Sequence, residues 1–220
     1  SEYWNTENSN KNAKIVTTQR DYLAGITSTD ITRRFLLPED IVAAHDAGII
    51  HFHDADYFAQ NALHNCDLIN LEDMLQNGTS INGVMIEKPH RFLTAMTIAT
   101  QIITAVNSSQ YGGCTVTLTH LAPFIRSSRE YYEKKYKERK LTKAQITKFV
   151  EEDLRKEITD GVQTFQYQIN SMTTTNGQAP FLSVCMYLGE TTEYKEELAM
   201  LIEEVLRQRI QGMKNEKGVY

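Results

Sequence analysis

The chain has 220 residues, of which 41% are hydrophobic and 23% are charged, and its formal net charge is -5. This composition is ordinary for a globular protein with a buried core, and the acidic balance gives no reason to expect nucleic-acid binding. No apolar run reaches the roughly 18 residues of a membrane span, and no signal peptide opens the chain, so neither a membrane protein nor a secreted one is expected.

The first quarter of the chain is predicted to hold an arm and two short helices. Residues 1–20 are polar, so we expect an irregular N-terminal arm. A short helix is expected from Thr29 to Phe35. A clearer helix starts at Pro38, where a proline and two acids favour a first helical turn, and closes at Gly48. The following run, Ile49–His53, is predicted to be a short strand or an extended segment.

Three helices are predicted in the middle of the chain. Residues 90–108 carry apolar side chains on nearly every helical face, which predicts burial on more than one side. Residues 119–139 become progressively charged, which is typical of a solvated helix end. From a cap at Thr142, apolar residues recur every three or four positions as far as Ile169. Such a long single stripe predicts packing against another helix, either of this chain or of a second subunit.

The last part of the chain is predicted to contain a loop, a strand and a helix. Residues 173–180 form the loop, Phe181–Leu188 is a candidate buried strand, and a helix follows at about 193–213. Helices dominate and strands are few and buried, which favours an α/β architecture seen in part. The chain starts without methionine, and its last residues look like the start of a strand, so we expect a piece of a longer protein.

The histidines raise the possibility of a metal site. His51 and His53 would share one face of a strand, as the histidines on the first strand of metal-dependent amidohydrolases do, and His64 and Cys66 could add ligands. No later group of His, Lys or Asp completes such a site. A metal-dependent hydrolase that uses His51, His53 and His64 therefore stays an alternative to histidines that bind no metal.

The role of Cys66 is open on residue types alone. It could be a nucleophile, a metal ligand, a hydrogen-atom donor or a small core residue, and His64 would share its face of a strand. We expect Cys114 and Cys185 to be structural. Three well-separated cysteines do not form a secreted disulfide framework, so we expect a reducing cytoplasm. A P-loop or a dinucleotide-binding fingerprint needs a longer glycine-rich stretch than Tyr111-Gly112-Gly113 or Thr175-Asn176-Gly177.

Four stretches, in this order and spacing, resemble one known family. They are HDAGIIHFHDADY (residues 45–57), NALHNCDLINLEDML (61–75), NSSQYGG (107–113) and TTNGQAPF (174–181). Together they are similar to the catalytic subunit of the anaerobic, class III, glycyl-radical ribonucleoside-triphosphate reductases, and the resemblance runs from about residue 7 to the last residue.

The resemblance implies a helix-rich α/β fold that is part of a ten-stranded α/β barrel with long dimer-interface helices. It also implies reduction of ribonucleoside triphosphates to 2′-deoxyribonucleotides by radical chemistry, with formate as the reductant. Cys66 matches the family's second active-site cysteine, which donates a hydrogen atom to C2′ of the ribose. We therefore expect Cys66 on a strand, with its sulfur facing the same enclosed cavity as His64 and Asn65. His64 and Asn65 are the neighbouring substrate-binding residues that the resemblance implies, and no metal ligand is expected among residues 1–220.

The resemblance also implies partners and regulation. Residues 86–171 match the helical effector and dimer region, where Glu87 and Gln101 are expected to contact ATP or deoxynucleotide effectors of a homodimer. The ATP cone, the thiyl-radical loop, the glycyl radical with its radical-SAM activating enzyme, and the structural zinc site match nothing here. We expect them outside residues 1–220, so the piece alone should be inactive. A non-catalytic nucleotide-binding dimerisation module is the remaining alternative.

Overall fold

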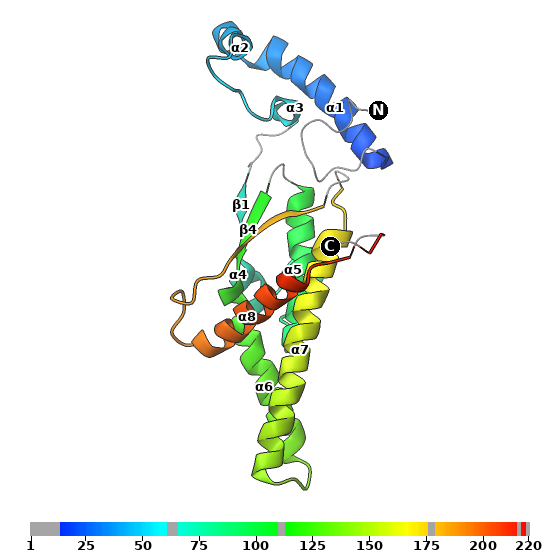
Figure 1. Ribbon diagram of the computed structural model, residues 1–220. Coiled ribbons are helices and arrows are strands. Elements are labelled where there is room, and N and C mark those ends of the chain that lie inside the picture. The colour runs from blue at the N-terminus through cyan, green and yellow to red at the C-terminus, as the bar shows by residue number, and fades with distance from the viewer. Residues whose placement is uncertain (1–13, 61–65, 110–112, 176–178, 215–216, 219–220) are drawn as a thin grey trace. The chain divides into compact units, whose positions relative to one another are not determined.

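The computed structural model describes residues 14–60, 66–109, 113–175, 179–214 and 217–218. It contains many helices, one three-stranded sheet and one two-stranded hairpin (Figure 1). The chain divides into two compact units, Ser1–Asp67 with Thr104–Cys114 and Met172–Phe181, and Leu68–Ile103 with Thr115–Ser171 and Leu182–Tyr220. None of the helices that the structure describes is long and apolar enough to cross a membrane. The predicted helix-rich α/β class is confirmed.

The N-terminal part of the first unit is built on small polar contacts. Its elements are α1 (Val16–Ile31), the π-helical turn η2 (Thr32–Leu36), α2 (Glu39–Asp46) and α3 (Ala55–Phe58). The hydroxyls of Ser28 and Thr32 both donate to the carbonyl of Ala55, each at 3.1 Å, and so join α1 and η2 to α3. Because the residues that α1 buries are Thr18, Gly25 and Ser28, no apolar stripe marks this helix in the sequence. Helix α1 covers residues 16–20 of the predicted arm and begins well before Thr29, so both predicted boundaries were wrong, and residues 1–13 of the arm lie outside the described residues.

Helix α2 confirms the predicted helix, whereas the strand, one of the two alternatives predicted after it, does not form. The helix begins directly after Pro38 and ends two residues before Gly48, whose φ of +70° is the left-handed conformation common after helices. Residues 49–53 then bend and turn. The backbone N–H of Phe52 donates to Nδ1 of His45 at 3.1 Å, so a side chain takes the place of a strand partner.

The second unit is organised around long helices. They are α5 (Phe92–Ser108, shared with the first unit), α6 (Ala122–Lys137), α7 (Lys143–Ser171) and α8 (Lys195–Gln211). All four were predicted, and the hydroxyl of Thr142 accepts from the N–H of Gln145 at 3.3 Å, which confirms the cap. Helix α7 packs against both α6 and α8 (Figure 1).

The apolar stripes of α5 and α7 are covered within the chain. Phe92, Met96 and Ile103 of α5 are fully buried, and Leu154 and Val162 of α7 are fully buried too. Gly161 lets the two helices approach closely, since a Cβ at Gly161 would lie 2.7 Å from Cε1 of Phe92. These stripes therefore need no second subunit to cover them, and a dimer stays a proposal.

A buried carboxylate fixes the start of α5 to α7. Glu157 is only 4% exposed, and it accepts hydrogen bonds from Nη2 of Arg91 at 2.9 Å and from the N–H of Leu93 at 3.1 Å. Arg91 also donates to the hydroxyl of Tyr132 at 2.5 Å, and its guanidinium lies over the rings of Tyr131 and Tyr132. Glu157 thus satisfies an N–H group that the first turn of α5 leaves without an intrahelical partner.

The three-stranded sheet is parallel, with the order β1 (Asp67–Leu68), β4 (Gly113–Thr117), β5 (Phe181–Cys185). A separate hairpin joins β2 (Thr79–Ile81) and β3 (Val84–Ile86) through Asn82 and Gly83, both with positive φ. The remaining short elements are α4 (Leu71–Gln76) and η3 (Leu118–His120). Strand β5 was predicted to be buried, but it lies at the edge of the sheet, and Phe181 is 61% exposed. Its apolar residues correctly predicted a strand, but the prediction that this strand is buried was wrong.

Candidate active site

The two faces of strand β4 differ. Cys114 and Val116 are almost fully buried, and Nδ2 of Asn107 in the last turns of α5 donates to Sγ of Cys114 at 2.9 Å. Thr115 and Thr117, which alternate with them, are partly exposed. Helix α5 therefore lies behind the face that carries Cys114. We call the opposite face of the strand, which carries Gly113 and Thr115, the open face.

Cys66 lies at a bend directly before β1 and is exposed. The N–H of Ile69 donates to the carbonyl of Thr115 at 2.9 Å. In a parallel ladder this bond pairs Ile69 with Val116, so the same register, extended back along β1, places Cys66 beside Gly113. Side chains alternate along a strand, and this alternation, extended back by the same one residue, predicts that Cys66 projects from the open face, away from α5.

Two details of the expectation for Cys66 were wrong. It precedes the strand by one residue instead of lying within it, and its side chain is exposed instead of enclosed. The two residues that were expected to share its cavity, His64 and Asn65, lie outside the described residues.

Gly113 allows strand β5 to come unusually close. A Cβ at Gly113 would lie 2.5 Å from Cδ1 of Phe181 and 3.2 Å from the carbonyl oxygen of Phe181. Only a residue without a side chain fits such an approach. Cys66, Gly113 and Phe181 therefore form one row across the three strands, at the end where the strands begin.

Two hydrogen bonds join Ser108, which precedes β4 in the sequence, to Thr175, which precedes β5. The N–H of Thr175 donates to the hydroxyl of Ser108 at 3.2 Å, and the hydroxyl of Thr175 donates to the carbonyl of Ser108 at 3.0 Å. Ser108 belongs to the NSSQYGG stretch and Thr175 to TTNGQAPF. The structure thus brings two of the four quoted stretches together, and both lead directly to the row that contains Cys66.

The environment of Cys114 suits a structural residue. Burial raises the pKa of the Cys114 thiol above its ordinary value, and the hydrogen bond from Asn107 offsets this only in part. Nearby Asp67 and Cys66 raise the same pKa further. A raised thiol pKa means less thiolate at neutral pH, and the thiolate is the reactive form.

The three thiols should therefore react very differently. With iodoacetamide at about pH 8, we expect the native chain to be alkylated at the exposed Cys66 and Cys185 well before the buried Cys114. Peptide mass mapping over time measures the three rates, and the same reaction in denaturant should make them similar. Alkylation of Cys114 as fast as that of Cys66 in the native chain would show that α5 does not cover the face that carries Cys114.

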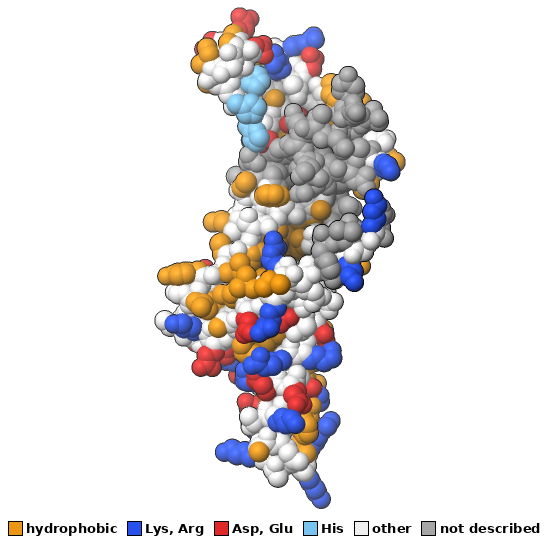
Figure 2. All heavy atoms as spheres, in the orientation of Figure 1, with side chains coloured by type: hydrophobic (Ala, Val, Ile, Leu, Met, Phe, Trp, Pro, Cys, Tyr) orange, Lys and Arg blue, Asp and Glu red, His pale blue; other side chains and the backbone are white. Residues whose placement is uncertain are grey.

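Three histidines of the first unit, His45, His51 and His53, form a surface group (Figure 2, pale blue). Nε2 of His51 lies 3.3 Å from Nδ1 of His53, and the ring of His45 lies next to that of His51. Among the described residues, no three His, Cys, Asp or Glu side chains are arranged to hold a metal ion. Of the three histidines of the hydrolase alternative, the structure brings two together, and His64 lies outside the described residues.

The two expected effector residues lie on separate elements. Glu87 is exposed in the segment between β3 and α5, and Gln101 is exposed on α5. Gln101 lies nine residues after Phe92, about 13 Å along the helix axis. Both side chains are accessible, and nothing further in the structure tests their role.

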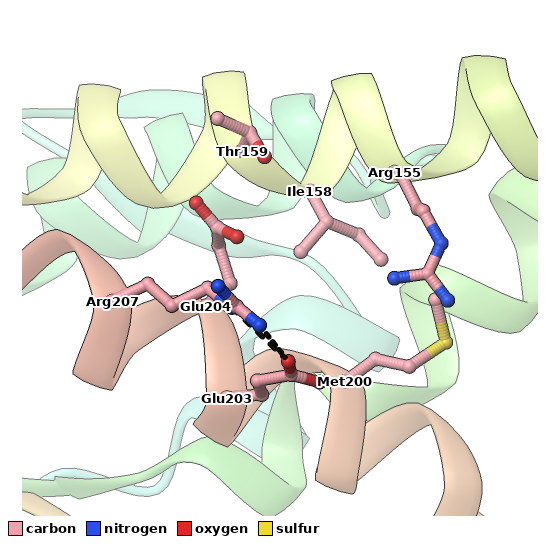
Figure 3. Close-up of a pocket in the computed structure, with 7 residues that line it drawn as sticks. All are labelled: Arg155, Ile158, Thr159, Met200, Glu203, Glu204 and Arg207. Atoms are coloured by element: carbon pink, nitrogen blue, oxygen red, sulfur yellow. Dashed lines mark hydrogen bonds and ion pairs between the residues drawn. The ribbon is translucent and has the colours of Figure 1, made fainter.

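A groove of about 270 Å³ runs between α7 and α8 (Figure 3). Three of its four charged side chains form ion pairs: Arg207 with Glu203 at 2.6 Å, and Arg155 with Glu151 at 2.8 Å. The fourth, Glu204, accepts a hydrogen bond from Nε2 of Gln208 at 2.8 Å. Ile158 and Met200 contribute apolar surface between them. Because each of these charged side chains already has a partner among neighbouring side chains, we assign this groove to helix packing.

The fold and the site define a class of protein first: an α/β protein with a free thiol on the open face of a parallel sheet and a helix behind the other face. Comparison with known proteins is specific. The family described as anaerobic ribonucleoside-triphosphate reductase matches residues 7–220, so the chain belongs to this family.

Individual relatives agree with this assignment. The anaerobic ribonucleoside-triphosphate reductase of Escherichia coli K12 is 38% identical over 96% of this chain, and that of phage T4 is 34% identical over 94%. The chain spans only 29% and 33% of the lengths of these two relatives. The crystal structure of the anaerobic ribonucleotide reductase from Thermotoga maritima in complex with dATP and CTP matches 86% of the chain, with a TM-score of 0.57 and 13% identity, over 32% of its own length. At that identity the match supports the fold alone.

Proposed function

We propose that this chain is the N-terminal portion of the catalytic barrel of an anaerobic ribonucleoside-triphosphate reductase, and that Cys66 is its hydrogen-atom donor to the substrate ribose. The observation that carries the proposal is the position of Cys66 on the open face of the sheet, with α5 behind the opposite face. In an α/β barrel the helices lie outside, so a side chain directed away from them enters the barrel interior. The three parallel strands would form part of the ten-stranded barrel.

The proposed reaction balances with one co-substrate. A ribonucleoside triphosphate, formate and one proton give the 2′-deoxyribonucleoside triphosphate, carbon dioxide and water. The S–H of Cys66 gives one proton and one electron, as a hydrogen atom, to C2′ after the 2′-hydroxyl has left as water. Formate supplies two electrons in total, which restore the thiol and complete the reduction of the sugar.

The residues around Cys66 suit this step. A hydrogen-atom donor must be a protonated thiol that meets the substrate, and Cys66 is a free, exposed cysteine. Cys114, the other cysteine at this end of the sheet, is turned toward α5 and held by Asn107. We assign substrate contacts to His64 and Asn65 through their place next to Cys66 in the sequence.

Other parts of the full-length protein would complete the activity. A glycyl radical, installed by a radical-SAM activating enzyme, would supply the radical that activates the ribose, and a structural zinc site would lie elsewhere in the full-length protein. We propose a cytoplasmic homodimer whose ATP or deoxynucleotide effectors contact Glu87 and Gln101. The three free thiols support a reducing compartment. The 220-residue chain alone should be inactive.

The test is a formate balance on the full-length, activated enzyme. With carbon-labelled formate and CTP, we expect one labelled carbon dioxide for each deoxynucleotide formed, and no product without formate. Product formation that continues in the absence of formate would refute the proposed reductant. Absence of any deoxynucleotide from an enzyme with a full radical signal would refute the proposed function itself.

A further inference from the structure

Phe181 is exposed in a place where an aromatic ring is unusual. It begins β5, it is 61% exposed, and its ring lies against the backbone of β4 at Gly113. Large aromatic side chains are among those that folding normally removes from water. A phenyl ring held on the open face therefore calls for a contact other than the core of this unit.

The ring lies over Gly113, on the strand between Phe181 and the strand that follows Cys66. Neighbouring strands lie about 4.8 Å apart, and β4 lies between β1 and β5. Cys66 and Phe181 thus flank Gly113, one on each side, on the same face. Since Cδ1 of Phe181 lies 2.5 Å from where a Cβ of Gly113 would be, the ring occupies the space of the missing side chain. An apolar surface therefore lies over Gly113, the residue that the register places beside Cys66.

We propose that Phe181 is a positioning residue for the hydrogen-atom transfer: its ring forms an apolar wall beside Cys66, against which the ribose of the substrate is held. The inference rests on the proposed function. Gly113 is required for this position of the ring, because any side chain at residue 113 would displace it. The open face would then offer the sugar one reactive S–H group and one inert surface.

The chemistry of phenylalanine suits such a wall. Its aromatic C–H bonds are strong, so a sugar radical in contact with the ring has no hydrogen atom to take from it. A tyrosine hydroxyl in the same place would offer a weaker O–H bond and a competing donor. An apolar wall also keeps water away from the reacting carbon, and correct placement of the reacting atoms is worth large factors in rate.

The experiment compares Phe181→Ala, Phe181→Leu and wild type in the full-length, activated enzyme. Phe35→Ala is the matched control, because Phe35 is also exposed, at 75%, and lies on η2. Deoxynucleotide formation and the glycyl radical signal in EPR are followed with and without CTP. The Phe181→Ala enzyme is expected to lose about tenfold in kcat and to lose its radical during turnover while keeping it without substrate. The leucine variant, which restores an apolar surface, should recover most of kcat.

The outcomes separate the wall from the proposed function. In one outcome, the Phe181→Ala enzyme stays within about twofold of wild type in both kcat and substrate-dependent radical loss, while the Cys66→Ser enzyme is inactive. That result would agree with the proposed role of Cys66 and would refute the proposed role of Phe181. Equal loss of radical with and without CTP in both Phe181 variants would indicate a purely structural role and would also overturn it. A Cys66→Ser enzyme that still forms product contradicts the proposed function instead.

Discussion

Replacing Cys66 by serine in the full-length enzyme is expected to abolish deoxynucleotide formation while glycyl radical formation and effector binding stay close to wild type. A serine O–H bond is far stronger than a cysteine S–H bond, so serine cannot deliver a hydrogen atom to C2′. The two side chains are similar in size, and Cys66 is exposed, so any loss of stability should stay within about 1 kcal/mol. Product analysis beside EPR on the same sample measures both effects.

The other two cysteines are the matched controls for this change. Cys185→Ser alters an exposed thiol at the far end of β5, and Cys114→Ser alters a buried one. Both enzymes should retain measurable turnover, with a stability loss at Cys114, because a hydroxyl would replace the sulfur in a buried position. A Cys66→Ser enzyme with near wild-type turnover would make Cys66 an ordinary cysteine and remove the assigned role.

Replacing Glu157 by alanine is expected to destabilise the second unit by about 1.5–3 kcal/mol, the usual contribution of hydrogen bonds to a charged group, because Glu157 is buried while Arg91 is partly exposed. The change leaves Arg91 without its carboxylate and the N–H of Leu93 without its acceptor at the start of α5. Urea unfolding of the chain, followed by circular dichroism, measures the loss as a lower midpoint.

The control for Glu157 is Glu203→Ala. Glu203 also pairs with an arginine, Arg207, but both side chains are more than half exposed. Exposed pairs within one helix contribute little, so the midpoint should hardly move. Equal shifts of the urea midpoint for the two variants would show that the buried Glu157 contributes no more to stability than the exposed Glu203.

The structure separates what local pattern can predict from what it cannot. Helix α7 was predicted because its buried residues form one apolar stripe, from Val150 to Ile169. Helix α1 was missed because the residues it buries, Thr18, Gly25 and Ser28, form no apolar stripe, and Ser28 joins α3 through a hydrogen bond to the carbonyl of Ala55. Strand β5 was predicted from its apolar residues, but its place at the sheet edge depends on which strands are its neighbours. The spacing of apolar residues therefore predicts which face of a helix or strand is buried only where the buried side chains are themselves apolar.

The candidate site divides in the same way. Cys66 was singled out through the resemblance, and the structure adds the face from which it projects. The contact of Gly113 with Phe181 joins residues 68 positions apart, and no local pattern announces it. Its only trace in the sequence is that the two residues end the stretches NSSQYGG and TTNGQAPF. Asn107 was also missed, because a hydrogen bond to a buried sulfur leaves no pattern in the sequence.

The origin of the new C2′ hydrogen tests the role of Cys66 most directly. The full-length enzyme turns over CTP once, first with ordinary formate in deuterium oxide, then with C-deuterated formate in ordinary water, and the product is analysed for deuterium at C2′. A thiol exchanges its hydrogen with solvent, so donation by Cys66 predicts deuterium at C2′ in the first experiment and hydrogen in the second. Deuterium carried from formate to C2′ in ordinary water would contradict it, because formate would then reduce the carbon directly, without the thiol.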